Sequence, residues 1–93
     1  MATKSDRQAA RETVVKYHES QLAVLVERVG EAIDGFRVGE RDAFDVDQVL
    51  FQYSRAAKEL WKFCNLGDPE LGANIMRERP AVDWWDRGAP RKP

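Results

Sequence analysis

The side chains best suited to catalysis or metal binding in this chain are His18 and Cys64, its only histidine and its only cysteine. An imidazole can accept the proton of a thiol, or can share a metal ion with the thiolate. A zinc site needs about four ligands, and a nucleophile needs a third group to orient its base. The chain has no other histidine or cysteine to supply these groups. We therefore expect His18 and Cys64 to pack in the helical seam, with metal or thiol chemistry as an alternative. The sequence predicts no catalytic residue, no metal site and no cofactor.

A basic row at helical spacing, formed by Arg55, Lys58 and Lys62, is a candidate for contact with phosphates. Glu59 falls within the same face, where ion pairs with Arg55 and Lys62 would neutralise much of the row. The chain as a whole has 15 basic and 16 acidic residues, so no overall positive field attracts nucleic acid. Nucleic acid is therefore not the expected partner, and an accessory regulator of the antitoxin type is kept as an alternative function.

The first element that must position these side chains is a long amphipathic helix at about 6–37. Its apolar positions alternate steps of three and four, which is the period of an α-helix with one buried stripe. The stripe consists of Val15, His18, Leu22, Leu25, Val29, Ala32 and Phe36, widened by Val14, Val26 and Ile33.

The second element is a helix at about 45–64. Asp45 is the predicted N-cap, with Gln48 at the third helical position and Phe44 packing on Val49. A broad apolar arc suggests more than one neighbour for this helix: Val46, Val49, Leu50, Tyr53, Ala56, Ala57, Leu60, Trp61, Phe63 and Cys64. The short connection before the helix favours an antiparallel hairpin. If the chain turns near residues 41–42, His18 and Cys64 lie at nearly the same level.

The remaining residues predict a short third helix and a tail. Asp68 can cap a helix at about 69–78, which Pro69 would open. The tail, 80–93, is rich in proline and charge, yet we expect Trp84 and Trp85 to dock on another surface. Alternating β-branched residues, the pattern of strands, are absent. The predicted fold is all-α: one domain, 1–93, with an antiparallel two-helix hairpin, a short third helix and an aromatic C-terminal tail.

The sequence also bears on the compartment. The N-terminal segment is polar where a signal peptide is apolar, and no run approaches the roughly 18 apolar residues of a membrane span. A lone cysteine fits a reducing environment. We therefore expect a cytoplasmic protein without membrane contact.

Large apolar side chains on the expected outer surfaces are candidates for contact with another protein. Tyr17 and Val24 share the outer side of the first helix, and Phe51 falls between polar residues of the second. The full set of candidates is Tyr17, Val24, Phe51, Trp61, Trp84 and Trp85. Cover by the third helix and tail is an equal alternative, but a two-helix core with spare apolar surface is well served by a partner. We expect a non-enzymatic interaction or self-association module, with a protein partner or a homodimer.

Two short runs carry a resemblance to a known family. Residues 59–64 read ELWKFC and residues 83–88 read DWWDRG. Together they resemble a family of short bacterial all-helical proteins of unassigned function, over most of the chain from Tyr17 to Gly88. The resemblance implies a bacterial cytoplasmic setting and transfers no active site.

Overall fold

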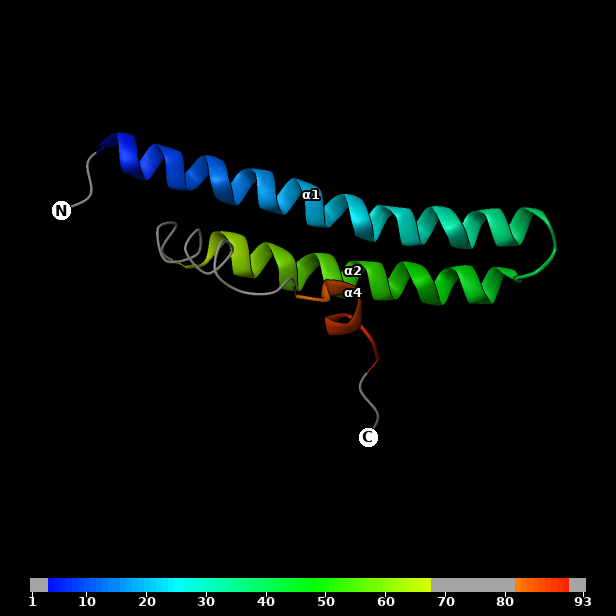
Figure 1. Ribbon diagram of the computed structural model, residues 1–93. Helices are drawn as coiled ribbons and strands as arrows, with labels where there is room; N and C mark the ends of the chain where they lie inside the picture. The colour runs from blue at the N-terminus through cyan, green and yellow to red at the C-terminus, as the bar shows by residue number, and fades with distance from the viewer. Residues whose placement is uncertain (1–3, 68–81, 91–93) are drawn as a thin grey trace.

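The computed structural model describes residues 4–67 and 82–90. Two long helices, α1 (Lys4–Arg37) and α2 (Ala43–Asn65), run antiparallel, and a short helix, α4 (Trp84–Arg87), lies against α2 (Figure 1). The predicted all-α hairpin is confirmed, and these residues contain no strand. The helix predicted at 69–78 lies outside the described residues. The tail, expected to be coil, contains α4 instead.

The hairpin turn begins with a glycine cap on α1. Gly39 has a φ of +80°, in the left-handed region. Its N–H donates to the Phe36 carbonyl at 3.2 Å, and the Glu40 N–H donates to the Gly35 carbonyl at 2.9 Å. This pair of bonds is the Schellman motif, which satisfies carbonyls that the helix end leaves free. The predicted end of the first helix at residue 37 is confirmed.

The second helix begins at Ala43, and its predicted cap was wrong. Asp42 is the N-cap: its Oδ1 accepts from the Asp45 N–H at 2.9 Å, and the Asp45 Oδ2 accepts from the Asp42 N–H at 3.0 Å. Asp45 therefore occupies the third helical position of a reciprocal capping box. The predicted packing of Phe44 on Val49 was also wrong, because Phe44 is 79% exposed.

The seam between the long helices is built from small and branched apolar side chains. Leu25, Ala56 and Leu60 are buried in one cluster, together with Trp84 of α4. The predicted stripe of α1 is rotated: Val14 is buried and the neighbouring Val15 is exposed. Successive helical residues point about 100° apart, so the rotation of the helix about its axis decides which of the two valines is buried.

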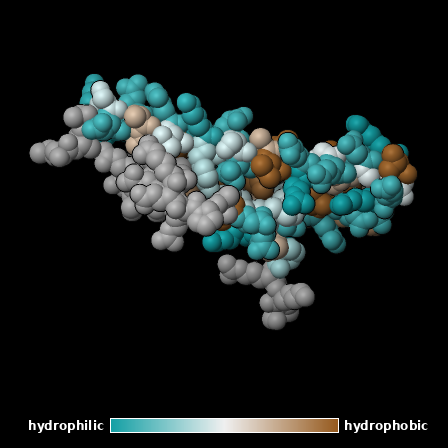
Figure 2. Space-filling view, in the orientation of Figure 1, coloured by the Kyte–Doolittle hydropathy of each residue, from teal (hydrophilic) through white to brown (hydrophobic). Residues whose placement is uncertain are grey.

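Phe36, also assigned to that stripe, is exposed as well. It belongs to the last turn of α1, level with the first turn of α2, where the partner helix is only beginning. The space-filling view shows apolar side chains at the surface of this turn end of the hairpin (Figure 2).

The C-terminal segment, residues 82–90, is here called the docked segment. Its Trp84 side chain contacts both long helices. Trp84 is 7% exposed, and its Nε1–H donates to the Tyr17 hydroxyl of α1 at 2.9 Å. Its ring lies 5.2 Å from that of Phe63 on α2, and the Phe63 ring lies 5.9 Å from that of Tyr17, measured between centroids. The expected docking of Trp84 is confirmed, and its surface is the hairpin itself.

Gly88 brings the backbone of the segment directly onto α2. A Cβ atom at Gly88 would lie 2.5 Å from the Ala56 nitrogen and the Gln52 carbonyl oxygen. Gln52 Nε2 donates to the Trp85 carbonyl at 2.9 Å, and Arg55 Nε donates to the Gly88 carbonyl at 2.6 Å. The close approach requires both a glycine on the segment and a small residue at Ala56.

A comparison of two glycines tests the turn. Gly39→Ala forces a side chain into the left-handed region and should cost about 1–2 kcal/mol of unfolding free energy. Gly30→Ala, inside α1 with open space around its Cβ position, should instead stabilise by up to about 1 kcal/mol. Urea unfolding measures both values. Equal effects of the two substitutions would contradict the assigned turn.

A second substitution tests the docked segment. In Gly88→Ala the new methyl group meets backbone atoms of α2 that cannot move cheaply, so we expect a loss of about 1–3 kcal/mol. The indole N–H of Trp84 should then exchange faster with water by NMR. Gly30→Ala is the matched control, since its indole exchange should equal that of the wild type. Unchanged exchange in Gly88→Ala would show that Gly88 does not hold the segment.

Candidate interaction surface

The thiol of Cys64 lies in an apolar setting. It is free and half-buried, and it packs against Ala10 and Val14 of α1. Burial raises the pKa of the Cys64 thiol to about 11. Because α2 starts at Ala43, the hairpin centre lies nearer residue 40 than expected, which sets Cys64 level with about residue 16, between Val14 and His18. This environment favours a neutral, packed thiol over a nucleophile.

The part of the chain that the structure describes contains no cluster of metal ligands. No three histidine, cysteine, aspartate or glutamate side chains come together there in a way that would hold an ion. His18 is half-buried on α1.

Two members of the basic row on α2, Arg55 and Lys62, bind different groups within the chain. Lys62 Nζ lies 3.5 Å from Glu59 Oε1, which is the predicted neutralising pair. Arg55 was expected to pair with Glu59, but its Nε donates to the Gly88 carbonyl of the docked segment. The row therefore does not present three equivalent cations to a phosphate backbone.

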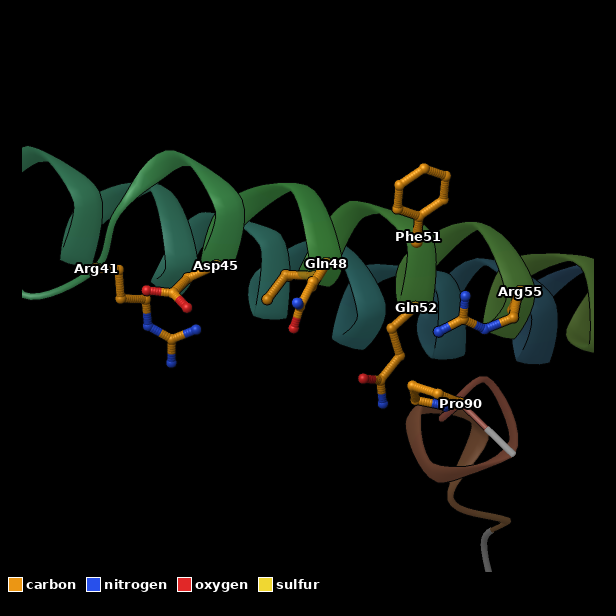
Figure 3. A pocket seen from close by; sticks show the side chains of 8 residues that line it. Arg41, Asp45, Gln48, Phe51, Gln52, Arg55 and Pro90 are labelled. Carbon is orange, nitrogen blue, oxygen red and sulfur yellow. The ribbon is translucent and has the colours of Figure 1, made fainter. Parts of the chain in front are cut away.

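Two hollows of mixed charge border the docked segment on α2. The larger, about 510 Å³, is lined by Arg41, Asp45, Gln48, Val49, Phe51, Gln52, Arg55 and Pro90. Figure 3 shows Arg41, Gln48 and Gln52 pointing to one side of α2, while Phe51 points away from them. The other, about 490 Å³, is lined by Arg55, Lys58, Glu59, Arg87, Ala89 and Pro90. Neither set of residues contains a histidine or a cysteine.

Three of the six interaction candidates lie where α4 meets the hairpin. Tyr17 was placed on the outer side of the first helix, but it is half-buried against the core and bonded to Trp84. Trp84 itself is part of that core. Trp85 is half-buried, and the guanidinium carbon of Arg28 lies 5.8 Å from its ring centroid, within cation–π range.

The other three candidates are exposed but do not share one side of the molecule. At about 100° per residue, Val24 lies about 100° from the buried Leu25, and Phe51 about 140° from the buried Ala56, in the rotational sense of the residues that contact α4. Trp61 lies in the other sense. The helical rotation of each residue relative to the buried seam shows the difference.

On α2, the docked segment and the exposed Trp61 lie on opposite sides of the seam. At about 100° per residue, Gln52 and Arg55 lie about 40° and 100° from the buried Ala56 in one rotational sense. Leu50 and Trp61 lie about 120° and 140° from Ala56 in the other sense. The side of α2 that carries Leu50 and Trp61 is thus turned away from α4.

On α1, the same division separates two valines from the docked segment. Tyr17 and Arg28, which contact the tryptophans, lie about 80° and 60° from the buried Leu25 in one sense. Val15 and Val26 lie about 80° and 100° from Leu25 in the other sense. In antiparallel neighbours, equal rotational senses from the seam face the same side, so these valines share a side with Leu50 and Trp61.

This side of the hairpin carries apolar side chains along both long helices, and this group is here called the apolar face. The exposed Glu19, about 120° from Leu25 in the same sense, lies at its α1 edge. Four of its side chains are largely exposed: Val15 at 66%, Val26 at 52%, Leu50 at 44% and Trp61 at 51%. The half-buried residues between them complete the face: Leu22, Val29 and Ile33 of α1, and Val46 and Ala57 of α2.

The sequence prediction included Trp61 among the contact candidates but assigned Val15, Val26 and Leu50 to the buried stripes. The useful signal was the width of the apolar arcs, which exceeds what a single partner helix covers. No described helix is long and apolar enough to cross a membrane.

No protein-family model, curated protein or solved structure matches the chain.

The state of the Cys64 thiol gives a test of the chemical alternative. With a pKa of about 11, alkylation by iodoacetamide should keep accelerating as the pH rises toward 11, and at pH 8 it should be at least tenfold slower than in urea. The raised pKa also means that this group's contribution to stability is intact below pH 9 and declines as pH rises toward 11. Cys64→Ala, which should lack that decline, is the control. Fast alkylation that levels off by pH 8 would instead identify an activated thiol.

Proposed function

We propose that this chain is a non-catalytic protein-interaction module that binds a protein partner through the apolar face. The observation that carries the proposal is the grouping of four large exposed apolar side chains on one side of the hairpin, Val15, Val26, Leu50 and Trp61. Scattered exposed apolar residues are ordinary, but a contiguous face at helical spacing is typical of a surface that another helix covers.

The charge of the chain supports a protein partner over nucleic acid. The formal net charge is −1, and phosphate binding draws its affinity from clustered cations. Arg55 and Lys62 of the basic row are already engaged with Gly88 and Glu59. The antitoxin-type alternative therefore has less structural support than the interaction module.

The cellular setting is proposed from the cysteine and the family resemblance. Cys64 is a free thiol, which fits a reducing compartment. The similarity of residues 59–64 and 83–88 to short bacterial helical proteins implies a bacterial cytoplasm.

Site-specific photo-cross-linking in the cells that produce this chain tests the proposal. A benzophenone amino acid at Trp61, on the apolar face, should give a discrete protein adduct. The same group at Phe51 is the matched control, because Phe51 is at least as exposed as Trp61 on α2, 59% against 51%, but lies off the face. We expect no adduct from that position.

A further substitution makes the adduct specific to the face. Val26→Lys places a charge on the apolar face from α1 and should abolish the adduct formed from Trp61, since an apolar interface cannot hold an unpaired charge. An adduct that persists in Val26→Lys, or that forms equally from Phe51, would contradict the proposal. So would the absence of any adduct from Trp61.

A further inference from the structure

We infer that the partner of the apolar face is a second copy of this chain, packed face to face with its hairpin turn at the opposite end. The product is an antiparallel four-helix bundle with two-fold symmetry. This inference rests on the proposed function, because it names the partner of the same face.

The α2 part of the apolar face is complementary to itself when reversed. Leu50 and Ala57 are equally distant from a centre between residues 53 and 54, and so are Val46 and Trp61. An antiparallel pairing of two α2 helices about that centre sets Leu50 opposite Ala57 of the second copy, and Trp61 opposite Val46. Each pairing sets a large side chain against a smaller one, which is how facing layers interdigitate.

The α1 part of the face has the same kind of symmetry about residue 24. Val15 and Ile33 are equally distant from it, as are Leu22 and Val26. Reversed pairing of two α1 helices therefore sets these four apolar residues opposite one another, while Val29 falls opposite Glu19.

The two centres lie within one helical turn of each other along the hairpin. The hairpin centre near residue 40 makes residue 24 level with about residue 56, which is within one helical turn, about 5.4 Å, of the α2 centre. A single two-fold axis across the face can therefore serve both pairings. A self-complementary patch with one axis is the requirement for a closed dimer.

Charges at the edge of the face agree with this arrangement. Glu12 and Arg37 lie nearly symmetrically about the α1 centre, and so do Lys16 and Asp34, so each acid meets a base of the second copy. All four side chains are exposed on the edge of α1 that borders the face. Opposite charges across an interface select its register and orientation.

The competing arrangement, with both turns at the same end, pairs α1 with α2 of the second copy. At matching levels it sets Asp34 opposite Asp47, two exposed acids on the edge of the face. Like charges in such a position oppose association. In the opposite-end arrangement Asp47 lies instead near Lys58 of the second copy.

The size of the face suits a small dimer. From Val15 to Ile33 it runs about 27 Å along α1. Two helices side by side are about 20 Å wide, so each copy would bury on the order of 600 Å², at the lower end of a standard interface.

Sedimentation equilibrium of the full chain across a concentration series tests the dimer. We expect the wild type to be dimeric, Leu50→Lys to raise the dimer dissociation constant at least 100-fold, and Phe51→Lys, off the face, to leave it unchanged. Circular dichroism and the Trp84 indole resonance establish that each variant is folded. A monomer at every concentration, or equal weakening by both lysines, overturns the inference.

A cross-link tests the orientation. In a Cys64→Ala background, Ser54→Cys places one thiol per copy beside the proposed axis, so a short bifunctional thiol reagent should link two copies in high yield. Ser20→Cys, exposed on α1 off the face, is the control and should not link them. Because the same-end arrangement separates the two Ser54 positions by about two helix widths, a dimer that fails to cross-link there overturns the proposed orientation.

These outcomes separate this inference from the proposed function. If the photo-adduct from Trp61 contains a different protein and the purified chain is monomeric, the second-copy inference is wrong and the interaction module stands. If Trp61 gives no adduct in cells and the chain is monomeric, both are wrong.

Discussion

The docking of Trp84 and Gly88 onto the hairpin is the interaction on which the rest of this structure depends. Two helices alone bury apolar surface along a single seam. A chain of 93 residues buries a smaller fraction of its surface on folding than a larger domain does, so a third packed element matters to its stability. Trp84 joins Leu25, Ala56 and Leu60 in the buried cluster, so it adds a third element to that seam. Removing a buried tryptophan of this kind typically costs about 3–5 kcal/mol, a large share of the stability of a small domain.

The docked segment also makes the two sides of the hairpin unequal. On one side, Gln52, Arg55 and Tyr17 hold the segment through hydrogen bonds, so polar groups of the long helices are used within the chain. On the other side, Leu50 and Trp61 remain exposed. The apolar arc of α2 is wider than one neighbouring helix covers. Part of it is buried in the seam, and the rest lies on a side of the hairpin that α4 does not contact.

Periodicity predicted the hairpin but not which edge of each stripe would be buried. The 3.6-residue repeat and the short connection were enough to predict two antiparallel helices. A repeat of this kind does not resolve Val14 from Val15, because the choice depends on helix rotation of about 100°, set by packing. The contact of Tyr17 with Trp84 spans 67 residues, and no local pattern reveals it. The cap was misplaced because Asp42 and Asp45 both suit an N-terminus.

Tertiary packing also decides which of the apolar side chains stay exposed, so the residues of the candidate surface differ from the predicted ones while the surface is still apolar. The sequence pointed to spare apolar surface, yet Tyr17 and Trp84 are consumed inside the chain, and Val15, Val26 and Leu50 take their place. Apolar packing around Cys64 raises the pKa of its thiol and so disfavours the thiolate, which is the form needed for nucleophilic or metal chemistry. The long helices use polar contacts to hold the C-terminal segment on one side and leave exposed apolar side chains on the other, which is why we propose association through that side.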